Sequence, residues 1–314
     1  MSKIILITGG SGFIGSNLSR KLLGDKSNFV VCLDNLYSSS IDNILELKNN
    51  QNFLFINKDV TDKSILSLPF SQIDEIYHLA CPASPPLYQK DPIFTLDTNY
   101  LGTKNVLEVA RKYNSKILLA STSEIYGDPM VDEQHENYWG NVNSYGPRSC
   151  YDEGKRVAET LFREYRMKYN LETRIVRIFN TYGPFMNKND GRVVSNFINQ
   201  ALEGKMITIY GNGKQTRSLC YIDDLLEGIT MLMKSDISEP TNIGNPNEMT
   251  INELACKIIE LTSSKSSVIF MKLPEDDPQK RKPVIKKAIE KLNWYPKVSL
   301  EDGLIKTINY YKSV

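Results

Sequence analysis

The chain has 314 residues, enough for one large domain or two coupled domains, and its 38 basic and 37 acidic residues leave a net charge of +1. This balance provides no field that would attract nucleic acid or an anionic membrane, so neither is an expected partner. Two histidines and five scattered cysteines without a C-x-x-C pair argue against a metal site and favour a reducing, cytoplasmic location.

The first 180 residues alternate short apolar runs with longer helical patterns. The first apolar run is too short for a signal peptide or a membrane span. The alternation predicts βαβ units, and therefore an α/β fold with a Rossmann-type, doubly wound parallel sheet. The expected strands lie at 3–8, 29–33, 53–56, 75–79, 116–120 and 174–178, and the expected helices at 13–23, 92–113 and 151–169.

Beyond Gly183 and Pro184 the pattern loosens into mixed short helices and strands. We interpret this part as a smaller C-terminal lobe that binds the substrate. The expected division is a dinucleotide-binding Rossmann domain over 1–180 and the lobe over 181–314. The boundary is approximate, and the chain is free to cross between the two parts.

A glycine-rich turn follows the first expected strand directly. Gly10, Gly12 and Gly15 satisfy the pattern G-x-G-x-x-G at the start of the next helix, and Asp34 ends the second strand about 20 residues later. This context predicts a dinucleotide site with the pyrophosphate at the positive end of the helix. Asp34 accepts hydrogen bonds from a ribose but repels a 2′-phosphate, so NAD is favoured over NADP.

The residues expected to contact NAD come from the turn, the ends of the next strands and the helix that begins near 151. For the residues of the glycine-rich turn, the alternative interpretation is a turn that binds no ligand. For Asp59 and Val60, which follow the third strand, an ordinary strand-end cap is an equally good interpretation. The expected NAD contacts are Gly9, Gly12, Phe13, Ile14, Gly15, Asp34, Asn35, Asp59, Val60, Leu79, Tyr151 and Lys155.

A Tyr-x-x-x-Lys pattern predicts the group that transfers a proton. On a helix this spacing places a phenol one turn from an ammonium, which favours the phenolate and is expected to bring its pKa from about 10 toward neutrality. The pattern occurs at Tyr100, Tyr151 and Tyr210. Tyr210 precedes a Gly-Asn-Gly turn and Tyr100 lies before the fifth strand, so Tyr151 with Lys155 is the candidate pair.

The loop after the fifth expected strand supplies the remaining chemistry. It begins with Ser121-Thr122-Ser123-Glu124, which places hydroxyls and one carboxylate at the end of the strand. In isolation Thr122 is better interpreted as a strand-end hydroxyl, Glu124 as a surface carboxylate and Lys155 as a solvated helix lysine. Together with Tyr151 they form a set that favours catalysis.

These motifs identify a family resemblance over nearly the whole chain. The chain resembles the extended short-chain dehydrogenase/reductase superfamily and, within it, the UDP-glucuronic acid decarboxylases. The segments that carry the resemblance are TGGSGFIG at 8–15, YHLACPASPP at 77–86, ASTSEIYGDP at 120–129, YWGNVNSYGPRSCYDEGKR at 138–156, RIFNTYGP at 177–184, NDGRVVSNFI at 189–198, YGNGKQTRS at 210–218 and DDPQKRKP at 276–283.

The resemblance implies decarboxylation of UDP-glucuronate to UDP-xylose, with NAD recycled in the site. Tyr151, assisted by Lys155 and Thr122, removes the C4 hydroxyl proton while hydride passes to NAD⁺. The C6 carboxylate is then β to a ketone, so CO₂ leaves an enolate that is protonated at C5 before the hydride returns. Ser123 and Glu124 act near C5 and C6.

The resemblance also implies substrate contacts in the smaller lobe and a homodimer. A diphosphate substrate requires cations, and arginine pairs well with such groups. For Tyr210, stacking on uracil and packing as an ordinary strand tyrosine are about equally good interpretations. The helices at 92–113 and 151–169 are expected to pair across a two-fold axis. The expected substrate contacts are Asn180, Arg192, Tyr210, Arg217 and Arg281, with Arg281 facing the anionic end of the sugar.

Two positions depart from the family pattern. Cys81 stands where relatives usually carry Ser, and Asp97 where they usually carry Lys. Asp97 is expected to place a negative charge near the cofactor and sugar end of the fold, so the lysine's contacts do not transfer.

Two other classes of function remain open. A 4,6-dehydratase or a 4-epimerase uses the same scaffold, but dehydratases typically carry Asp-Glu after the threonine, where this chain has Ser123-Glu124. A dinucleotide-sensing module without catalysis is the second alternative. The presence of Thr122, Tyr151 and Lys155 together argues against the sensing module.

Overall fold

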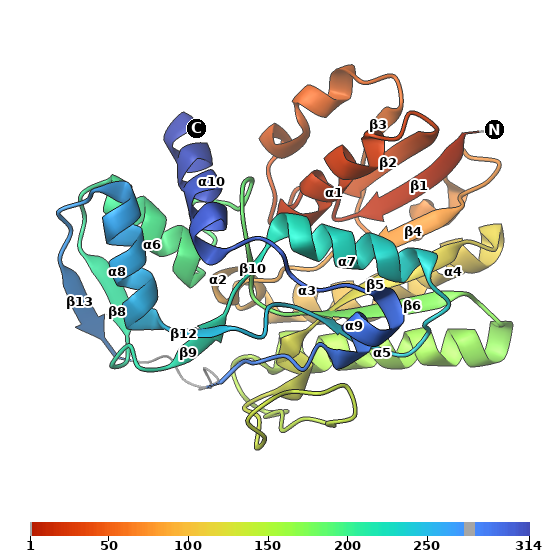
Figure 1. Cartoon of the computed structure of the whole chain (residues 1–314). Coiled ribbons are helices and arrows are strands. Elements are labelled where there is room, and N and C mark those ends of the chain that lie inside the picture. The colour runs from red at the N-terminus through yellow and green to blue at the C-terminus, as the bar shows by residue number, and fades with distance from the viewer. Residues whose placement is uncertain (1, 273–279) are drawn as a thin grey trace.

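The computed structural model describes residues 2–272 and 280–314, and its centre is a seven-stranded sheet in which every strand pairing is parallel (Figure 1). The strand order is β11-β6-β5-β4-β1-β2-β3, so the order reverses beside β1. The strands of this sheet are β1 (Lys3–Thr8), β2 (Asn28–Asp34), β3 (Phe53–Asn57), β4 (Glu75–His78), β5 (Lys116–Thr122), β6 (Thr173–Ile178) and β11 (Thr241–Ile243).

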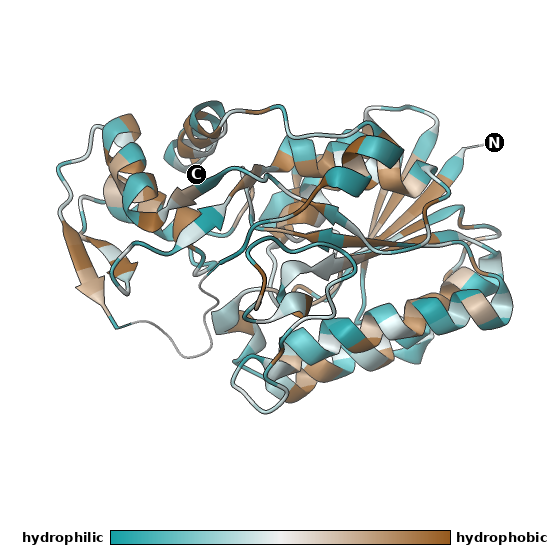
Figure 2. Cartoon of the chain, turned by 60° about the horizontal axis from the view of Figure 1, so that its bottom comes forward, coloured by the Kyte–Doolittle hydropathy of each residue, from teal (hydrophilic) through white to brown (hydrophobic). Residues whose placement is uncertain are grey.

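Helices cover both faces of the sheet. On one face lie α1 (Phe13–Leu23) and α7 (Ile222–Lys234), and on the other α4 (Thr103–Tyr113) and α5 (Ser149–Tyr169). Alternate strand residues therefore enter different cores: Ile5 and Ile7 pack with α1 and α7, whereas Leu6 packs with α4 and α5. In Figure 2 the strands are accordingly brown, and the outward surfaces of the helices are largely teal.

The sequence predicted this framework closely. All six expected strands are present within two residues of their expected bounds, and the helix at 13–23 has the expected bounds. The expected helix at 92–113 is interrupted, because α3 (Pro92–Asp97) is joined to α4 by a π turn, Thr98–Gly102. The α/β fold with a Rossmann-type doubly wound sheet is confirmed.

The smaller lobe packs beyond the carboxyl ends of the strands. In Figure 1 it lies to the left of the sheet, with α6 and α8 beside the pair β8 and β13. Its elements are α6 (Val193–Leu202), β8 (Ile207–Tyr210), β9 (Thr216–Ser218), β12 (Glu248–Thr250), α8 (Ile251–Thr262), β13 (Val268–Met271) and α10 (Leu300–Ser313). Short connecting elements are α2 (Pro85–Tyr88), β7 (Thr181–Tyr182), β10 (Cys220–Tyr221), α9 (Lys286–Leu292) and the 3₁₀ turns at Ile41–Ile44, Glu46–Asn49, Lys63–Ser67 and Ser123–Tyr126.

The chain crosses between the two parts more than once. The strand β11 pairs with β6 at the edge of the sheet, and α7 packs on the sheet with α1, although both follow residue 180. Residues 181–314 therefore do not all lie in the smaller lobe, and the division of the chain at residue 180 stays a prediction. The first four residues of the 276–283 motif lie outside the described residues.

Candidate active site

One cleft of about 520 Å³ lies between the carboxyl ends of the strands and the smaller lobe. Ligands of open parallel sheets bind at this edge, where the strand order reverses. Every residue that the sequence predicted for catalysis, cofactor or substrate lines this cleft. They are Gly9, Gly12, Phe13, Ile14, Gly15, Asp34, Asn35, Asp59, Val60, Leu79, Thr122, Ser123, Glu124, Tyr151, Lys155, Asn180, Arg192, Tyr210, Arg217 and Arg281.

The glycine turn is so tight that side chains would not fit. Gly9 has a φ of +72°, which favours glycine. A Cβ on Gly15 would lie 2.3 Å from the Gly9 carbonyl oxygen. Helix α1 begins directly after Gly12, which offers no side-chain cap, and its first turn holds no acidic residue. The turn therefore leaves the positive end of α1 open to the cleft, an arrangement that fits a pyrophosphate.

The ends of β2 and β3 carry the acidic groups of the cofactor side. Asp34 is buried, and its carboxylate accepts hydrogen bonds from the Ser11 N–H at 3.1 Å and the Leu36 N–H at 2.8 Å. The Asn35 side chain donates to Asp59 at 2.7 Å. These bonds orient Asp34 at the rim of the cleft, as a ribose-binding carboxylate requires, so the residues present fit NAD.

Two aromatic residues on the cofactor side of the cleft were not predicted from the sequence. Tyr37 and Phe94 both line the cleft, and their ring centroids are 4.5 Å apart. Phe94 lies on α3 and Tyr37 follows β2, so nothing in the local sequence joins them. Tyr37 lies three residues after Asp34, and this closeness to the expected ribose-binding carboxylate was the one hint in the sequence that Tyr37 lines the cofactor side.

Tyr151 lies in the first turn of α5, buried beneath the cleft. Its ring stacks on Tyr88 at 4.9 Å between centroids. The Lys155 ammonium donates to the Ala120 carbonyl at 2.9 Å and lies 5.9 Å from the centre of the Tyr151 ring. Thr122, at the end of β5, is hydrogen-bonded to the phenol.

The expectation that Lys155 brings the Tyr151 pKa toward neutrality is wrong for the chain by itself. Burial raises the pKa of the phenol well above its ordinary value, and the nearby Cys81 thiol acts in the same direction. The hydrogen bond with Thr122 opposes them without reversing the shift. A phenolate at Tyr151 therefore requires further positive charge in the cleft.

Glu124 is held between two guanidinium groups. Its Oε2 accepts hydrogen bonds from Arg148, the residue that precedes α5, and from Arg281 at 2.6 Å. All three side chains are at least about nine-tenths buried. Burial alone disfavours the charged form, but Arg281 and Arg148 outweigh it and keep the pKa of the Glu124 carboxyl below its ordinary value. Glu124 is therefore an anion at neutral pH.

Asp152 lies in the first turn of α5, four residues after Arg148. Its Oδ1 is buried and has no hydrogen-bond partner among the described residues. Burial, reinforced by the Glu124 charge, raises the pKa of the Asp152 carboxyl to about 7. Neither Arg148 nor Asp152 was assigned a role from the sequence, although both belong to the segment at 138–156 that carries part of the family resemblance.

The remaining predicted contacts come from the smaller lobe and its junction with the sheet. Asn180 follows β6, and Arg192 precedes α6 and donates to the Ala83 carbonyl at 2.5 Å. Arg217 is buried on β9, and its charge also acts on Glu124. Tyr210 is 45% exposed at the end of β8. The lobe thus presents cations and one accessible aromatic ring to the cleft, while their individual roles stay predictions.

The two departures from the family pattern differ in their positions. Cys81 lines the cleft and accepts a hydrogen bond from Asn99 at 3.2 Å. Asp97 is exposed at the end of α3 and is not among the described residues that line the cleft, whereas its neighbours Phe94 and Thr98 are. Asp97 is therefore close to the cleft without lining it, and the expectation that it places a negative charge near the cofactor and sugar end of the fold stays a prediction.

This combination of a glycine turn, a strand-end threonine and a Tyr-x-x-x-Lys pair in one cleft defines the extended short-chain dehydrogenase/reductase class. The chain belongs to the family described as GDP-mannose 4,6 dehydratase, whose family model matches residues 6–307. Within 2–272 and 280–314, no helix is long and apolar enough to cross a membrane and no group of three or more His, Cys, Asp or Glu could hold a metal ion.

Similar individual proteins and solved structures are nucleotide-sugar enzymes. UDP-glucuronic acid decarboxylase 6 of Arabidopsis thaliana is 51% identical over 300 residues, which are 96% of this chain and 86% of that protein. The crystal structure of UDP-glucose 4-epimerase from Thermotoga maritima with UDP-glucose has a TM-score of 0.91 at 30% identity and covers 99% of both chains. That of the dTDP-glucose 4,6-dehydratase DesIV from Streptomyces venezuelae, with NAD and TYD bound, has a TM-score of 0.91 at 26% identity and covers 99% of this chain and 97% of the other.

Proposed function

We propose that the protein decarboxylates UDP-glucuronate to UDP-xylose and CO₂, with NAD retained in the site. The observation that carries this proposal is the contact of Glu124 with Arg148 and Arg281 in the same cleft as Tyr151 and the glycine turn. The full-length similarity to an enzyme of this name supports it. The net reaction consumes one proton, because the carbon that loses CO₂ gains a hydrogen.

Proton transfer at the C4 oxygen is assigned to Tyr151, assisted by Thr122 and Lys155. The glycine turn and Asp34 would hold NAD⁺, which would accept the C4 hydride and return it as NADH, and would also bring the positive charge that the buried phenol requires. Thr122 holds the phenol by a hydrogen bond, and Lys155 is fixed at the end of β5 by the Ala120 carbonyl. The phenol is thereby positioned to take the C4 hydroxyl proton and to return it after decarboxylation.

Glu124 and Ser123 act at the end of the sugar that carries the C6 carboxylate. As CO₂ leaves, the negative charge of the substrate carboxylate moves away to the C4 oxygen, and an anionic Glu124 near the carboxylate favours that movement. The electrons pass from the C5–C6 bond to the C4 oxygen, and C5 then takes a proton. The Ser123 hydroxyl lies 3.4 Å from the Glu124 carboxylate, which places a proton-bearing group at this end of the cleft.

The charge state of Glu124 separates this function from that of a 4,6-dehydratase. Expelling the C6 hydroxyl as water requires a protonated acid that lines the cleft. Glu124 lies between two guanidiniums and does not hold a proton at neutral pH. Asp152, with a pKa of about 7, is partly protonated at neutral pH, but it is not among the described residues that line the cleft.

The decisive experiment is product analysis of a substrate panel by mass spectrometry and NMR. UDP-glucuronate should yield CO₂ and UDP-xylose without added reductant, whereas UDP-glucose and dTDP-glucose should be unchanged. Loss of water from a hexose, inversion at C4 without loss of CO₂, or no turnover on any nucleotide sugar would each overturn the proposal. Release of a 4-keto pentose with NADH would show that the cycle is incomplete.

We further propose a cytoplasmic homodimer. Apolar side chains on α3 and the π turn remain exposed, with Ile93 at 72% and Leu96 and Leu101 at 42%. Met167 on α5 is 66% exposed. A second copy that covers these two helices would bury this apolar surface, and light scattering at micromolar concentration tests it. The cysteine pattern supports the location.

A further inference from the structure

The segment that carries Arg281 into the cleft is paired with a loop 148 positions earlier. The Gln134 N–H donates to the Lys282 carbonyl and the Val284 N–H donates to the Gln134 carbonyl, both at 2.8 Å. The Lys282 N–H donates to the Gln134 side-chain oxygen at 2.7 Å. These three bonds hold the residues directly after Arg281 in a single register.

Gln134 is itself fixed to the edge of the sheet. It is 2% exposed, and its carbonyl also accepts a hydrogen bond from the Asn242 side chain at 3.0 Å. The same Asn242 amide donates to the Val284 carbonyl at 3.2 Å and accepts from the Tyr126 hydroxyl at 2.8 Å. Asn242 is fully buried on β11, so one side chain ties the Arg281 segment, the Gln134 loop and the loop that contains Glu124.

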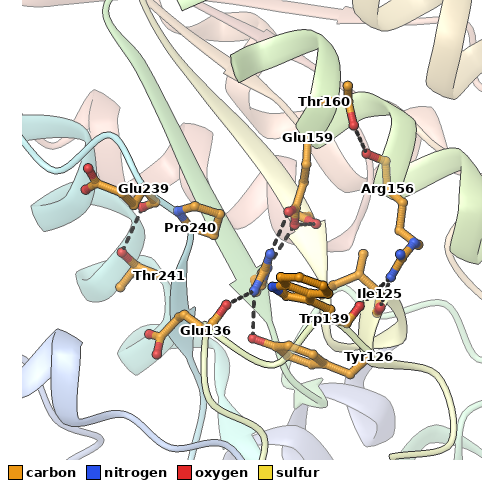
Figure 3. Close-up of polar contacts among 12 residues, drawn as sticks. Ile125, Tyr126, Glu136, Trp139, Arg156, Glu159, Thr160, Glu239, Pro240 and Thr241 are labelled. Atoms are coloured by element: carbon orange, nitrogen blue, oxygen red, sulfur yellow. Dashed lines mark hydrogen bonds and ion pairs between the residues drawn. The ribbon is translucent and has the colours of Figure 1, made fainter. Parts of the chain in front are cut away.

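A second buried group anchors the same loops. In Figure 3, Tyr126, Glu136 and Glu159 converge on one guanidinium, which belongs to Arg177 of β6. Arg177 donates to the Tyr126 hydroxyl and to the Glu136 carbonyl, both at 3.0 Å, and forms an ion pair with Glu159 at 2.8 Å. The loops on both sides of the Glu124–Arg281 contact therefore share an anchor on the sheet.

We propose that Gln134 is a positioning residue for the reaction, because its pairing with Lys282 and Val284 sets the Arg281 guanidinium on Glu124. This inference rests on the proposed function, since its effect is on the turnover of UDP-glucuronate. The exposed ion pairs of the same segment, Lys280–Asp132 and Lys282–Glu133, contribute little because solvent screens them. The buried bonds of Gln134 determine how far Arg281 reaches into the cleft.

The test compares two substitutions that keep the length of the side chain. Gln134→Met removes the acceptor for the Lys282 N–H and should lower kcat/KM for UDP-glucuronate by about 10- to 100-fold, because a small misplacement of a positioned group is costly. Gln134→Glu keeps that acceptor oxygen and should restore most of the activity. Lys280→Ala, one residue before Arg281 and exposed, is the control and should change kcat/KM by less than about twofold.

A double-mutant cycle shows whether Gln134 acts through Arg281. Gln134→Met should add less than about twofold to the loss caused by Arg281→Ala, because a misplaced group has no effect once it is absent. Activity within twofold of wild type for Gln134→Met, or an equal loss in both backgrounds, would overturn the inference. Gln134→Asn, which is too short to reach Lys282, must give the same pattern if Gln134→Met does not fold.

Failure of this inference is distinguishable from failure of the proposed function. The wild-type chain on UDP-glucuronate tests the function, and the cycle is then measured with whatever nucleotide sugar the wild-type chain turns over. NAD affinity and thermal midpoint are measured for every variant. Gln134→Met should bind NAD like wild type, because Gln134 is not among the described residues that line the cleft.

Discussion

The two ends of the cleft are built in different ways. The cofactor end is shaped by backbone: the turn at Gly9 to Gly15 is one continuous segment, and its function depends on side chains being absent. The sugar end is shaped by charge: Glu124, Arg148 and Arg281 come from three distant segments and meet through buried ion pairs. A defect in the first end should therefore act on binding of the dinucleotide, and a defect in the second on the chemistry.

Tyr151 lies where the two ends meet, and its substitution should have the largest effect. Tyr151→Phe removes the proton-transfer group and should lower kcat at least about 10³-fold, while NAD affinity stays unchanged because the ring remains. The measurement is single-turnover production of UDP-xylose beside NAD titration by fluorescence.

Tyr88→Phe is the matched control for this substitution. Its ring stacks on Tyr151, and its hydroxyl has no hydrogen-bond partner among the described residues. Removing that hydroxyl should change kcat by less than about threefold. If Tyr151→Phe kept a tenth of the wild-type activity, the proton would have another route.

Removal of one of the two arginines at the sugar end should have the next largest effect. Arg148→Met removes one of the guanidiniums that contact the buried Glu124, so the pKa of the carboxyl should rise and the fraction of anion should fall. We expect kcat/KM for UDP-glucuronate to fall about 100-fold and the acid limb of the pH–rate profile to move to higher pH. NAD affinity should not change.

The control for Arg148→Met is Arg163→Met, which lies on the same helix. The Arg163 side chain is 68% exposed and, among the described residues, forms an ion pair only with its neighbour Glu164. Its removal should leave both the rate and the pH profile unchanged. An Arg148→Met enzyme with the wild-type pH profile would show that Glu124 does not depend on this guanidinium.

The contrast between the two ends also explains what could be predicted from the sequence. The strands, the glycine turn and Asp34 follow from local patterns, because apolar periodicity and a positive φ are properties of one segment. The pairing of Gln134 with Lys282 is a tertiary contact with no local pattern. It could not be found in one sequence.

Burial explains the error on the pKa of Tyr151. The spacing of Tyr151 and Lys155 correctly places both in the cleft, but it does not report how deeply the phenol is buried, and burial controls its pKa. The position of Asp97 is less easily predicted from spacing, because the π turn at Thr98–Gly102 directly follows its helix. Its side chain is exposed and does not line the cleft among the described residues.

Asp152 offers a smaller, pH-dependent test of the charged end. Its pKa of about 7 in the folded chain is raised by burial and by Glu124. Between about pH 4 and 7 the folded chain holds a proton that the unfolded chain releases, so the free energy of unfolding falls as pH rises through this window. The expected loss between pH 5 and 8 is on the order of 2 kcal/mol. The charged or titratable groups that act on it are Glu124, Arg148, Arg281 and Glu153.

Urea denaturation of Asp152→Asn at several pH values measures this contribution. The amide cannot ionise, so the variant should lose the slope that wild type shows between pH 5 and 8. Glu153→Gln, next to it and more exposed, should keep the wild-type slope. Parallel pH profiles for wild type and Asp152→Asn would mean that the carboxyl titrates outside this window.

The smallest expected effect comes from the cofactor end. Gly15→Ala places a methyl group 2.3 Å from the Gly9 carbonyl, so the turn must open and the N-terminus of α1 must move away from the pyrophosphate. We expect the NAD affinity to fall about tenfold, with kcat at saturating NAD changed less than twofold. The control is Gly24→Ala, at the other end of α1. Its added methyl group would meet only the Lys21 carbonyl at 3.1 Å and should leave NAD affinity unchanged.

If Gly15→Ala lowered kcat and left NAD affinity unchanged, a defect in the backbone of the cofactor end would act on the chemistry. That result would contradict the division of the cleft into an end shaped by backbone and an end shaped by charge.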